Sequence, residues 1–203
     1  YSAYVVLEVH YNNVELSANR RDSSGLRFHY QAKLRPFDAG VLEIGLEYTD
    51  KNSIPPKMLA PLAGHCVGAC TRVAMSARAH KAKPQPQPQQ QQWPQPAHDQ
   101  QGIYIFAAQM HTHLTGVASW TELVRAGQLL GELQRDDHYS PHFQEIRLLA
   151  EPVRVLPGDA LIHYCLYDTG QRNNITLGGF ATSDEMCVAY LHYYPRIDLE
   201  VCK

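Results

Sequence analysis

Short apolar runs separated by turn residues recur along the chain. Within them hydrophobic and polar positions tend to alternate, and Val, Ile, Tyr and Phe are frequent, which is typical of β-strands with one buried face. No long segment shows the helical period of about 3.6 residues. The pattern predicts an all-β fold, an antiparallel jelly-roll β-sandwich with little helix. The runs expected to form strands are residues 4–11, 26–34, 40–48, 102–111, 121–127, 151–156, 160–168, 175–180 and 187–194.

Residues 81–101 differ in composition from the rest of the chain. They read KAKPQPQPQQQQWPQPAHDQQ, and a segment of mostly Pro and Gln has too few apolar side chains to bury a core. We therefore predict a disordered surface loop between two strands. A tolerated insertion explains such a loop more simply than an interaction tract does.

Composition and charge narrow the class of protein. With 44% hydrophobic residues among 203, the chain can build a core, and no apolar run reaches the ~18 residues of a membrane helix. The net charge is −2 and basic residues are not clustered, so neither nucleic acid nor an anionic membrane is an expected partner. The chain opens within an apolar run and without Met, so we expect a segment of a longer protein.

The five cysteines favour disulfides in an oxidising compartment over a zinc cluster. Cys66 and Cys70 form a CxxxC, but a zinc cluster would need a second closely spaced pair. Because the count is odd, one cysteine is either free or paired outside this segment. The sequon Asn174-Ile175-Thr176 predicts glycosylation at Asn174, which fits a secretory route.

The stretch QMHTHLTG, residues 109–116, carries candidate chemistry. It ends a short run rich in Ile, Tyr and Phe, so we place His111 and His113 on a strand, where residues two apart point to the same face. On a helix the two rings would lie roughly 200° apart and could not share one metal ion. The pair is therefore half of a candidate metal site.

The residues alone leave the third ligand open. Met186 offers a thioether that suits Cu(I), although one methionine in such a run is more typical of core packing. A cupin-type iron site needs a Glu four or five residues after the pair, and the first one, Glu122, lies too far along. A zinc site that recruits His138 or His142 remains an alternative. The remaining histidines apart from His10 are expected to be structural or exposed: His29, His65, His80, His98, His163 and His192.

Several stretches, in this order, resemble the copper type II, ascorbate-dependent monooxygenases: LEVHYNN, QMHTHLTG, DDHYSPHFQEIR, PGDALI, GGF, DEMC and HYYP. The resemblance covers nearly the whole chain except the Pro/Gln block. It implies two jelly-roll copper domains that face a solvent-filled cleft. Residues 1–20 would then be the last strand and exit of the first domain, and residues 21–203 the whole second domain.

The resemblance also implies the ligands of both coppers in a full-length chain. His111, His113 and Met186 match the ligands of the copper that meets oxygen and substrate. His10 matches one of three histidine ligands of the electron-transfer copper, and the other two are an adjacent pair. No His-His pair occurs in this sequence, so the segment alone is expected to hydroxylate nothing.

By position, the family's disulfides imply the pairs Cys66–Cys202 and Cys165–Cys187. Cys70 would then pair with a downstream cysteine outside this segment. A bridge at Cys187, directly after Met186, would fix the loop that aims the sulfur.

The resemblance implies an enzyme that uses O₂ and ascorbate to hydroxylate the benzylic carbon of a phenylethylamine. The peptide-amidating branch of the family carries Arg and Asn where this chain has Gln109 and Val188, so a peptide carboxylate is a disfavoured substrate. Tyr190 matches a pocket tyrosine of that branch. We expect tyramine as substrate, giving octopamine, with dopamine, giving noradrenaline, as the alternative. A copper-binding module without catalysis is a further alternative.

The ammonium group of such a substrate needs a partner. In residues 40–48 the alternation places Glu43 and Glu47 on one face, and Glu43 is the first candidate, although a solvated face is the simpler interpretation. The resemblance further implies a homo-oligomer in the secretory pathway, in a vesicle lumen or secreted, soluble or attached to a membrane.

Overall fold

The computed structural model describes residues 6, 7, 9, 11, 13, 15–30, 32, 35–78 and 102–203. The chain divides into two compact units, Tyr1–Leu34 and Arg35–Lys203. His10, most of the run 4–11 and the Pro/Gln block at 81–101 lie outside the described residues. The first unit has no helix or strand among its described residues.

The strand predicted over residues 26–34 is wrong for the part that the structure describes. Residues 26–30 adopt no regular secondary structure. Their large apolar side chains, such as that of Phe28, are exposed. An alternating pattern stabilises a strand only where one face is buried, and the described side chains of residues 26–30 are exposed on both faces.

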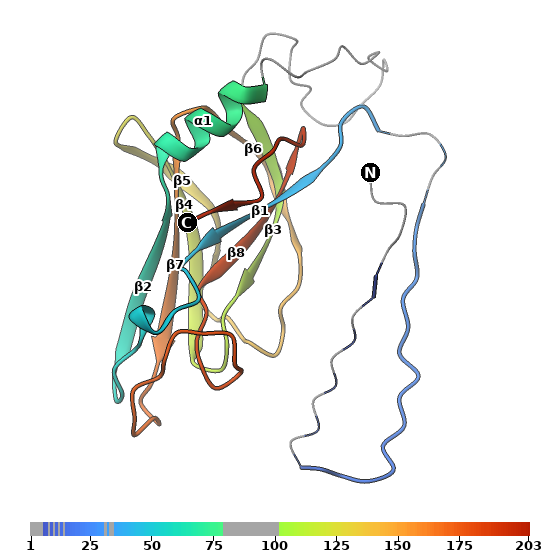
Figure 1. Cartoon of the computed structure of the whole chain (residues 1–203), viewed down its shortest axis with the longest axis vertical. Coiled ribbons are helices and arrows are strands. Elements are labelled where there is room, and N and C mark those ends of the chain that lie inside the picture. Colours follow the sequence, from blue (N-terminus) through green and yellow to red (C-terminus); the bar gives the residue numbers. More distant parts are fainter. Residues whose placement is uncertain are drawn as a thin grey trace. The chain divides into compact units, whose positions relative to one another are not determined.

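The second unit is the predicted antiparallel β-sandwich, with two sheets packed face to face (Figure 1). One sheet has the order β6-β3-β8-β1-β9 and the other the order β2-β7-β4-β5. Neighbouring strands are antiparallel except β1 and β9, which run parallel. The first sheet contains β1 (Gly40–Gly45), β3 (Ile103–His111), β6 (Arg147–Val155), β8 (Val188–Tyr194) and β9 (Val201–Cys202). The second contains β2 (Leu59–Cys66), β4 (Gly116–Arg125), β5 (Gln128–Asp136) and β7 (Ala160–Asp168).

The core lies between the sheets, and the alternation along each strand decides which side chains reach it. In β8, Leu191 and Tyr193 are buried, while Tyr190 and His192 on the other face are half-buried. Burying one such apolar side chain contributes about 1.5–3 kcal/mol, which fixes the register of the strand. The outer face of this sheet is thereby left for polar and aromatic side chains.

Five elements were not predicted: helix α1 (Gly68–Arg78), the 3-10 helix at Asp50–Asn52 and strands β2, β5 and β9. Helix α1 lies across one end of the sandwich (Figure 1). β2 and β5 are the two edges of their sheet. β2 contains Pro61, which an edge strand tolerates, and β5 is largely exposed. The amino-acid types of neither strand alternate regularly between apolar and polar, so the sequence did not indicate them. None of the helices in the described residues is long and apolar enough to span a bilayer.

The run at 175–180 also departs from the prediction. It forms only two isolated bridges, Ile54 with Thr176 and Gly178 with Glu185. Two glycines in succession, Gly178 and Gly179, weaken a strand because they have no side chain to pack. The segment instead connects β7 to the loop that precedes β8.

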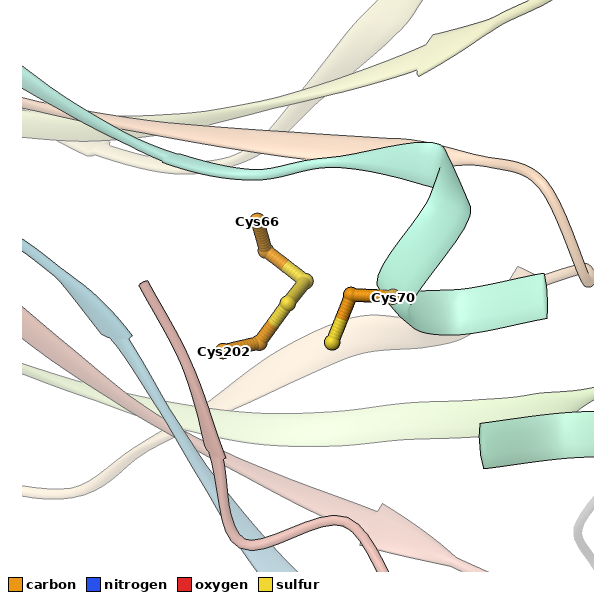
Figure 2. A group of neighbouring side chains, drawn as sticks. All are labelled: Cys66, Cys70 and Cys202. Atoms are coloured by element: carbon orange, nitrogen blue, oxygen red, sulfur yellow. A yellow bond between two sulfur atoms is a disulfide. The ribbon is translucent and has the colours of Figure 1, made fainter. Parts of the chain in front are cut away.

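Two disulfides join the sheets as the resemblance implied. Cys66–Cys202 links β2 to β9, and Cys165–Cys187 links β7 to the residue before β8. Cys70 on α1 has no disulfide partner within the described residues. Its sulfur lies beside the Cys66–Cys202 bridge (Figure 2), with the three sulfur atoms within 4.8 Å of one another.

Candidate metal centre

His111 and His113 lie at the end of β3 that points away from α1 (Figure 1). The strand ends at His111, and His113 follows in the turn toward β4. The two ring centroids are 5.2 Å apart, with an interplanar angle of 90°. Both side chains are half-buried. The two imidazoles are therefore neighbours, as the spacing predicted, but the placement of both on a strand is wrong for His113, because the strand ends two residues earlier.

The amide of Gln144 fixes the proton of His111. Nδ1 of His111 lies 2.5 Å from Oε1 of Gln144. The amide nitrogen of Gln144 donates to the carbonyls of Pro141 at 2.6 Å and Thr112 at 3.4 Å, so its oxygen must face the ring. An amide oxygen only accepts, and His111 therefore carries its proton on Nδ1.

The same logic applies to His113. Its Nδ1 lies 3.0 Å from the carbonyl oxygen of Asp184, which can only accept a hydrogen bond. Neither Nε2 has a hydrogen-bond partner among the described residues. In the neutral tautomer with a proton on Nδ1, Nε2 carries a lone pair, and this is the form that binds metal.

The pKa of His111 lies below its ordinary value of 6.5. Burial is the main cause, since it disfavours the charged ring, and His113 lowers the pKa further, whereas the hydrogen bond to Gln144 opposes the shift. The neutral, coordinating form of His111 is thus favoured into mild acid.

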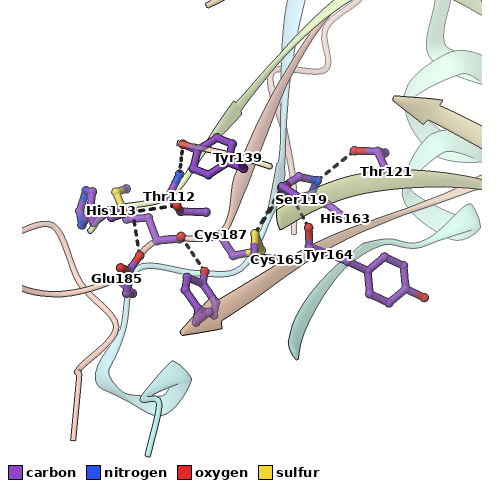
Figure 3. Close-up of a disulfide and its surroundings, with 12 residues drawn as sticks. Thr112, His113, Ser119, Thr121, Tyr139, His163, Tyr164, Cys165, Glu185 and Cys187 are labelled. Carbon is purple, nitrogen blue, oxygen red and sulfur yellow. Dashed lines mark hydrogen bonds between the residues drawn. A yellow bond between two sulfur atoms is a disulfide. The ribbon is translucent and has the colours of Figure 1, made fainter. Parts of the chain in front are cut away.

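Met186 follows the loop that contacts His113. Glu185, the residue before it, accepts a hydrogen bond from the backbone N–H of His113 at 2.8 Å (Figure 3). The carbonyl of Met186 accepts one from the Tyr167 hydroxyl at 2.7 Å. On its other side Cys187 is held by the disulfide to Cys165. The backbone around the half-buried Met186 is therefore held on both sides, directly after two residues that contact His113.

The donor set suits a soft metal. Two imidazole nitrogens and a thioether favour Cu(I), whereas Mg²⁺ and Ca²⁺ require oxygen ligands. The buried carboxylate of Glu185 accepts a hydrogen bond from the backbone of His113. Both of its oxygens already accept hydrogen bonds. The residues present therefore fit copper.

The alternative zinc site has no support in the described residues. His138 and His142 are exposed, and neither belongs to a group of three His, Cys, Asp or Glu side chains close enough to share an ion. The two groups that meet that distance are Cys66, Cys70 and Cys202, and His163, Cys165 and Cys187. Each contains a disulfide, whose sulfur atoms are not thiolate ligands.

A row of side chains crosses the outer face of the first sheet beside the histidines. Glu43 on β1 is paired with Tyr190 on β8, and Tyr190 with Gln109 on β3, two residues before His111. Directly paired residues point to the same face, so this row and His111 share one surface. The ring centroid of Tyr190 lies 6.5 Å from that of His111.

Glu43 is already engaged. Its carboxylate accepts a hydrogen bond from the Tyr48 hydroxyl and pairs with the ammonium of Lys203 at 2.5 Å. The side chain of Lys203 is only 9% exposed, and its nitrogen lies 3.6 Å from the centroid of the Tyr48 ring. Burial raises the pKa of Glu43, but the bonds from Lys203 and Tyr48 outweigh it and the pKa lies below its usual value. Glu43 is an ionised carboxylate that holds an ammonium group.

The other predicted site residues fall where their chemistry requires. Asn174 is exposed in the loop after β7, as an N-glycosylation acceptor must be. Val188 is fully buried at the start of β8 and offers no polar group to a ligand. Sequence reasoning missed Gln144 and Glu185, because their role depends on contacts with residues 33 and 72 positions away.

Comparison with known proteins agrees with this geometry. The chain matches the family described as "Copper type II ascorbate-dependent monooxygenase, C-terminal domain" over residues 37–81 and 90–203. It is 47% identical to dopamine beta-hydroxylase of Canis lupus familiaris over 203 residues, which is 100% of this chain and 29% of that protein. It is 44% identical to tyramine beta-hydroxylase of Caenorhabditis briggsae over 201 residues, 98% of this chain and 30% of that protein.

A third relative shows how far the likeness extends. DBH-like monooxygenase protein 1 of Homo sapiens is 39% identical over 200 residues, 98% of this chain and 29% of that protein. The chain thus spans less than a third of the length of these curated relatives. With a family match over most of its length, the chain belongs to the copper type II ascorbate-dependent monooxygenases, as their C-terminal domain.

Proposed function

We propose that this chain forms the oxygen- and substrate-binding copper domain of a monooxygenase that hydroxylates the benzylic carbon of a phenylethylamine. Tyramine is the proposed substrate and dopamine the alternative. One oxygen atom of O₂ enters the C–H bond and the other leaves as water, with two electrons supplied by ascorbate. The observation that carries the proposal is the pair of Nε2 lone pairs of His111 and His113 beside the Met186 loop.

We assign His111, His113 and Met186 as the ligands of one copper. When bound, copper supplies the redox chemistry with O₂ that no protein side chain provides. The chain's own residues prepare the site: Gln144 and the Asp184 carbonyl hold the ring protons on Nδ1, so that each Nε2 would keep a lone pair for the metal. The thioether favours the reduced state of the metal, which is the state that meets O₂.

For the substrate, the proposal places the amine near Glu43 and Tyr190. Both lie on the surface that carries His111, and Glu43 is ionised. Lys203 now occupies that carboxylate, so a substrate ammonium would have to share or displace it. Gln109 and Val188 in place of charged or amide anchors disfavour the peptide-amidating alternative.

Further parts of the proposal concern the complete enzyme. His10 would be one ligand of a second, electron-transfer copper, with residues 1–20 belonging to the domain that holds it. Cys70 would pair with a cysteine outside this chain, and the enzyme would be a homo-oligomer. The two disulfides fit folding in an oxidising compartment, and we propose a vesicle lumen or secretion, with glycan on Asn174.

X-ray absorption on the Cu(I)-loaded chain tests the ligand set. We expect about one copper per chain, bound with a copper–sulfur shell. Met186→Leu should lose the shell and Cu(I) affinity while zinc binding changes little, because the two side chains have similar volume and such swaps usually cost under about 1.5 kcal/mol. Met75→Leu, a buried methionine on α1, is the control and should keep the shell. A parent without copper–sulfur scattering would exclude Met186 as a ligand.

Activity distinguishes an enzyme from a copper-binding module. The protein with both copper domains should form product from tyramine or dopamine with ascorbate, copper and O₂, and the ratio of kcat/KM values identifies the substrate. The chain studied alone should bind copper and form no octopamine. Absence of turnover in the two-domain protein with both coppers bound would favour the binding module.

A further inference from the structure

Glu185 is a buried carboxylate with an unusual set of partners. It is only 4% exposed. Among the described residues, no Lys, Arg or His side chain forms an ion pair with it. Burying a carboxylate without a cation costs several kcal/mol unless hydrogen bonds replace the lost water. Its environment must therefore supply strong donors.

Those donors come from the turn that carries His113. Oε2 accepts from the backbone N–H of His113 at 2.8 Å. Oε1 accepts from the backbone N–H of Thr115 at 2.6 Å and from its hydroxyl at 2.7 Å. The turn can satisfy the carboxylate only when both backbone N–H groups point inward. Glu185 thus fixes the backbone conformation of His113 as well as its distance from the Met186 loop (Figure 3).

The backbone of Glu185 is held in turn. Its N–H donates to the carbonyl of Leu177 at 2.8 Å, and its carbonyl accepts from the N–H of Gly179 at 3.0 Å. The side chain therefore acts from a fixed position and not from a loose loop. Met186 is the next residue, so its thioether is separated from the fixed backbone of Glu185 by little more than its own side chain.

A second contact closes the same junction. The ring of His113 donates from Nδ1 to the carbonyl of Asp184, the residue before Glu185. The backbone of His113 and its ring are thus both tied to the segment that carries Met186. Among the described residues, the other two hydrogen bonds to the Glu185 carboxylate are both donated by Thr115.

We propose that Glu185 is a positioning residue that holds the histidine pair and Met186 at the spacing needed for one copper to bind all three. This inference rests on the proposed ligand set. It assigns to Glu185 no contact with the metal, because its oxygens are already occupied by the turn. If Glu185 had a purely structural role, its variants would be less stable, but those molecules that still fold would coordinate copper as the parent does.

The test compares Glu185→Gln with Glu132→Gln in the Cu(I)-loaded chain. Glu132→Gln is the matched control, because it makes the same change of a carboxylate to an amide on β5, where the carboxylate accepts hydrogen bonds from Arg135. Glu185→Gln replaces one acceptor with an N–H₂ that faces other N–H donors. We expect Cu(I) affinity to fall about 10- to 100-fold and the copper–sulfur shell to weaken or vanish, as for other residues that orient ligands. Glu132→Gln should match the parent, and zinc affinity should fall less than Cu(I) affinity in Glu185→Gln.

Thr115→Val covers the case in which Glu185→Gln does not fold. It removes one hydroxyl donor to Oε1 and keeps both backbone donors, so a smaller loss of Cu(I) affinity and of sulfur scattering is expected. A folded Glu185→Gln with parental affinity and an intact shell overturns this inference and leaves the ligand set standing. If only Thr115→Val folds, parental values for it overturn the inference in the same way. A parent without sulfur scattering overturns the ligand set itself and the positioning role with it.

Discussion

The side-chain oxygen of Gln144 meets Nδ1 of His111 because both hydrogens of its amide nitrogen are directed to backbone carbonyls. A side chain 33 residues away in sequence thereby selects the tautomer of a candidate metal ligand. The choice leaves Nε2 with its lone pair on the outer face of the sheet, where a copper ion can approach it.

Gln144→Leu should therefore weaken copper binding without unfolding the chain. Leu has a similar size but cannot accept the Nδ1 proton, so the ring is free to rotate and change tautomer. We expect copper affinity to fall about 10- to 100-fold, measured by competition with a chelator. Gln134→Leu is the control: the buried amide nitrogen of Gln134 has no hydrogen-bond partner in the part of the chain that the structure describes. That variant should keep parental affinity and unfold no more easily, with a gain of up to about 1 kcal/mol. Equal losses in both variants would contradict the role of Gln144.

Removing each disulfide in turn should show which bridge affects only the stability of the fold and which also affects the copper site. Cys165 and Cys187 close a sequence separation of 22 residues, and Cys66 and Cys202 one of 136. Loop-closure entropy predicts losses of about 3 and about 5 kcal/mol respectively when each pair is replaced by Ala. We expect the copper–sulfur shell to weaken only in Cys165→Ala/Cys187→Ala, because that bridge adjoins Met186. If the copper–sulfur shell were lost in Cys66→Ala/Cys202→Ala but kept in Cys165→Ala/Cys187→Ala, the bridge beside Met186 would not be the one that positions its sulfur.

His163 should make the fold sensitive to acid. The side chain is fully buried, with Nδ1 2.9 Å from the Thr121 hydroxyl and Nε2 3.3 Å from that of Ser119 (Figure 3). Burial lowers the pKa of His163 from 6.5 to about 3. Between these values only the unfolded chain binds the proton, so its free energy of unfolding should fall by about 1.4 kcal/mol per pH unit as the pH decreases from about 6.5.

Urea unfolding of the metal-free chain from pH 7 to pH 4 measures this effect. His163→Gln cannot titrate and should flatten the dependence by about the same slope. His65→Gln, at an exposed position on β2, controls for the loss of a histidine as such. Parallel curves for the parent and His163→Gln would show that the buried ring is not the source.

Glu43 and Lys203 should affect amine binding in opposite directions. If Glu43 binds the substrate ammonium, Lys203 competes with it for the same carboxylate oxygen. In the protein with both copper domains, Glu43→Gln should raise the KM for the amine about tenfold, equivalent to about 1.4 kcal/mol. Lys203→Met, which keeps the aliphatic stem, should lower it. The KM of a neutral phenylethanol analogue should respond to neither change. An unchanged amine KM in Glu43→Gln would assign the ammonium to another residue.

The sequence alone was sufficient for the sandwich and for the proximity of the two histidines. Alternation in β1, β3, β7 and β8 reflects burial of one face, which is a local property, so it can be read without knowing the partner strand. The HxH spacing predicted neighbouring rings, although only His111 lies on the strand and His113 follows in the turn. The sequence did not predict the edge strands β2 and β5, helix α1 or the irregular segment at 175–180. Their conformation depends on which neighbouring elements cover them.

The arrangement around the ligands was decided by tertiary structure. Gln144 beside His111, Glu185 beneath His113 and Lys203 on Glu43 join positions 33, 72 and 160 residues apart. Sequence spacing carries no record of such contacts, because a hydrogen bond depends on where packing brings two groups and not on their distance along the chain. Burial then sets their chemistry: the same imidazole is a structural residue at position 163 and a candidate ligand at position 111, according to which of its nitrogens the fold leaves open.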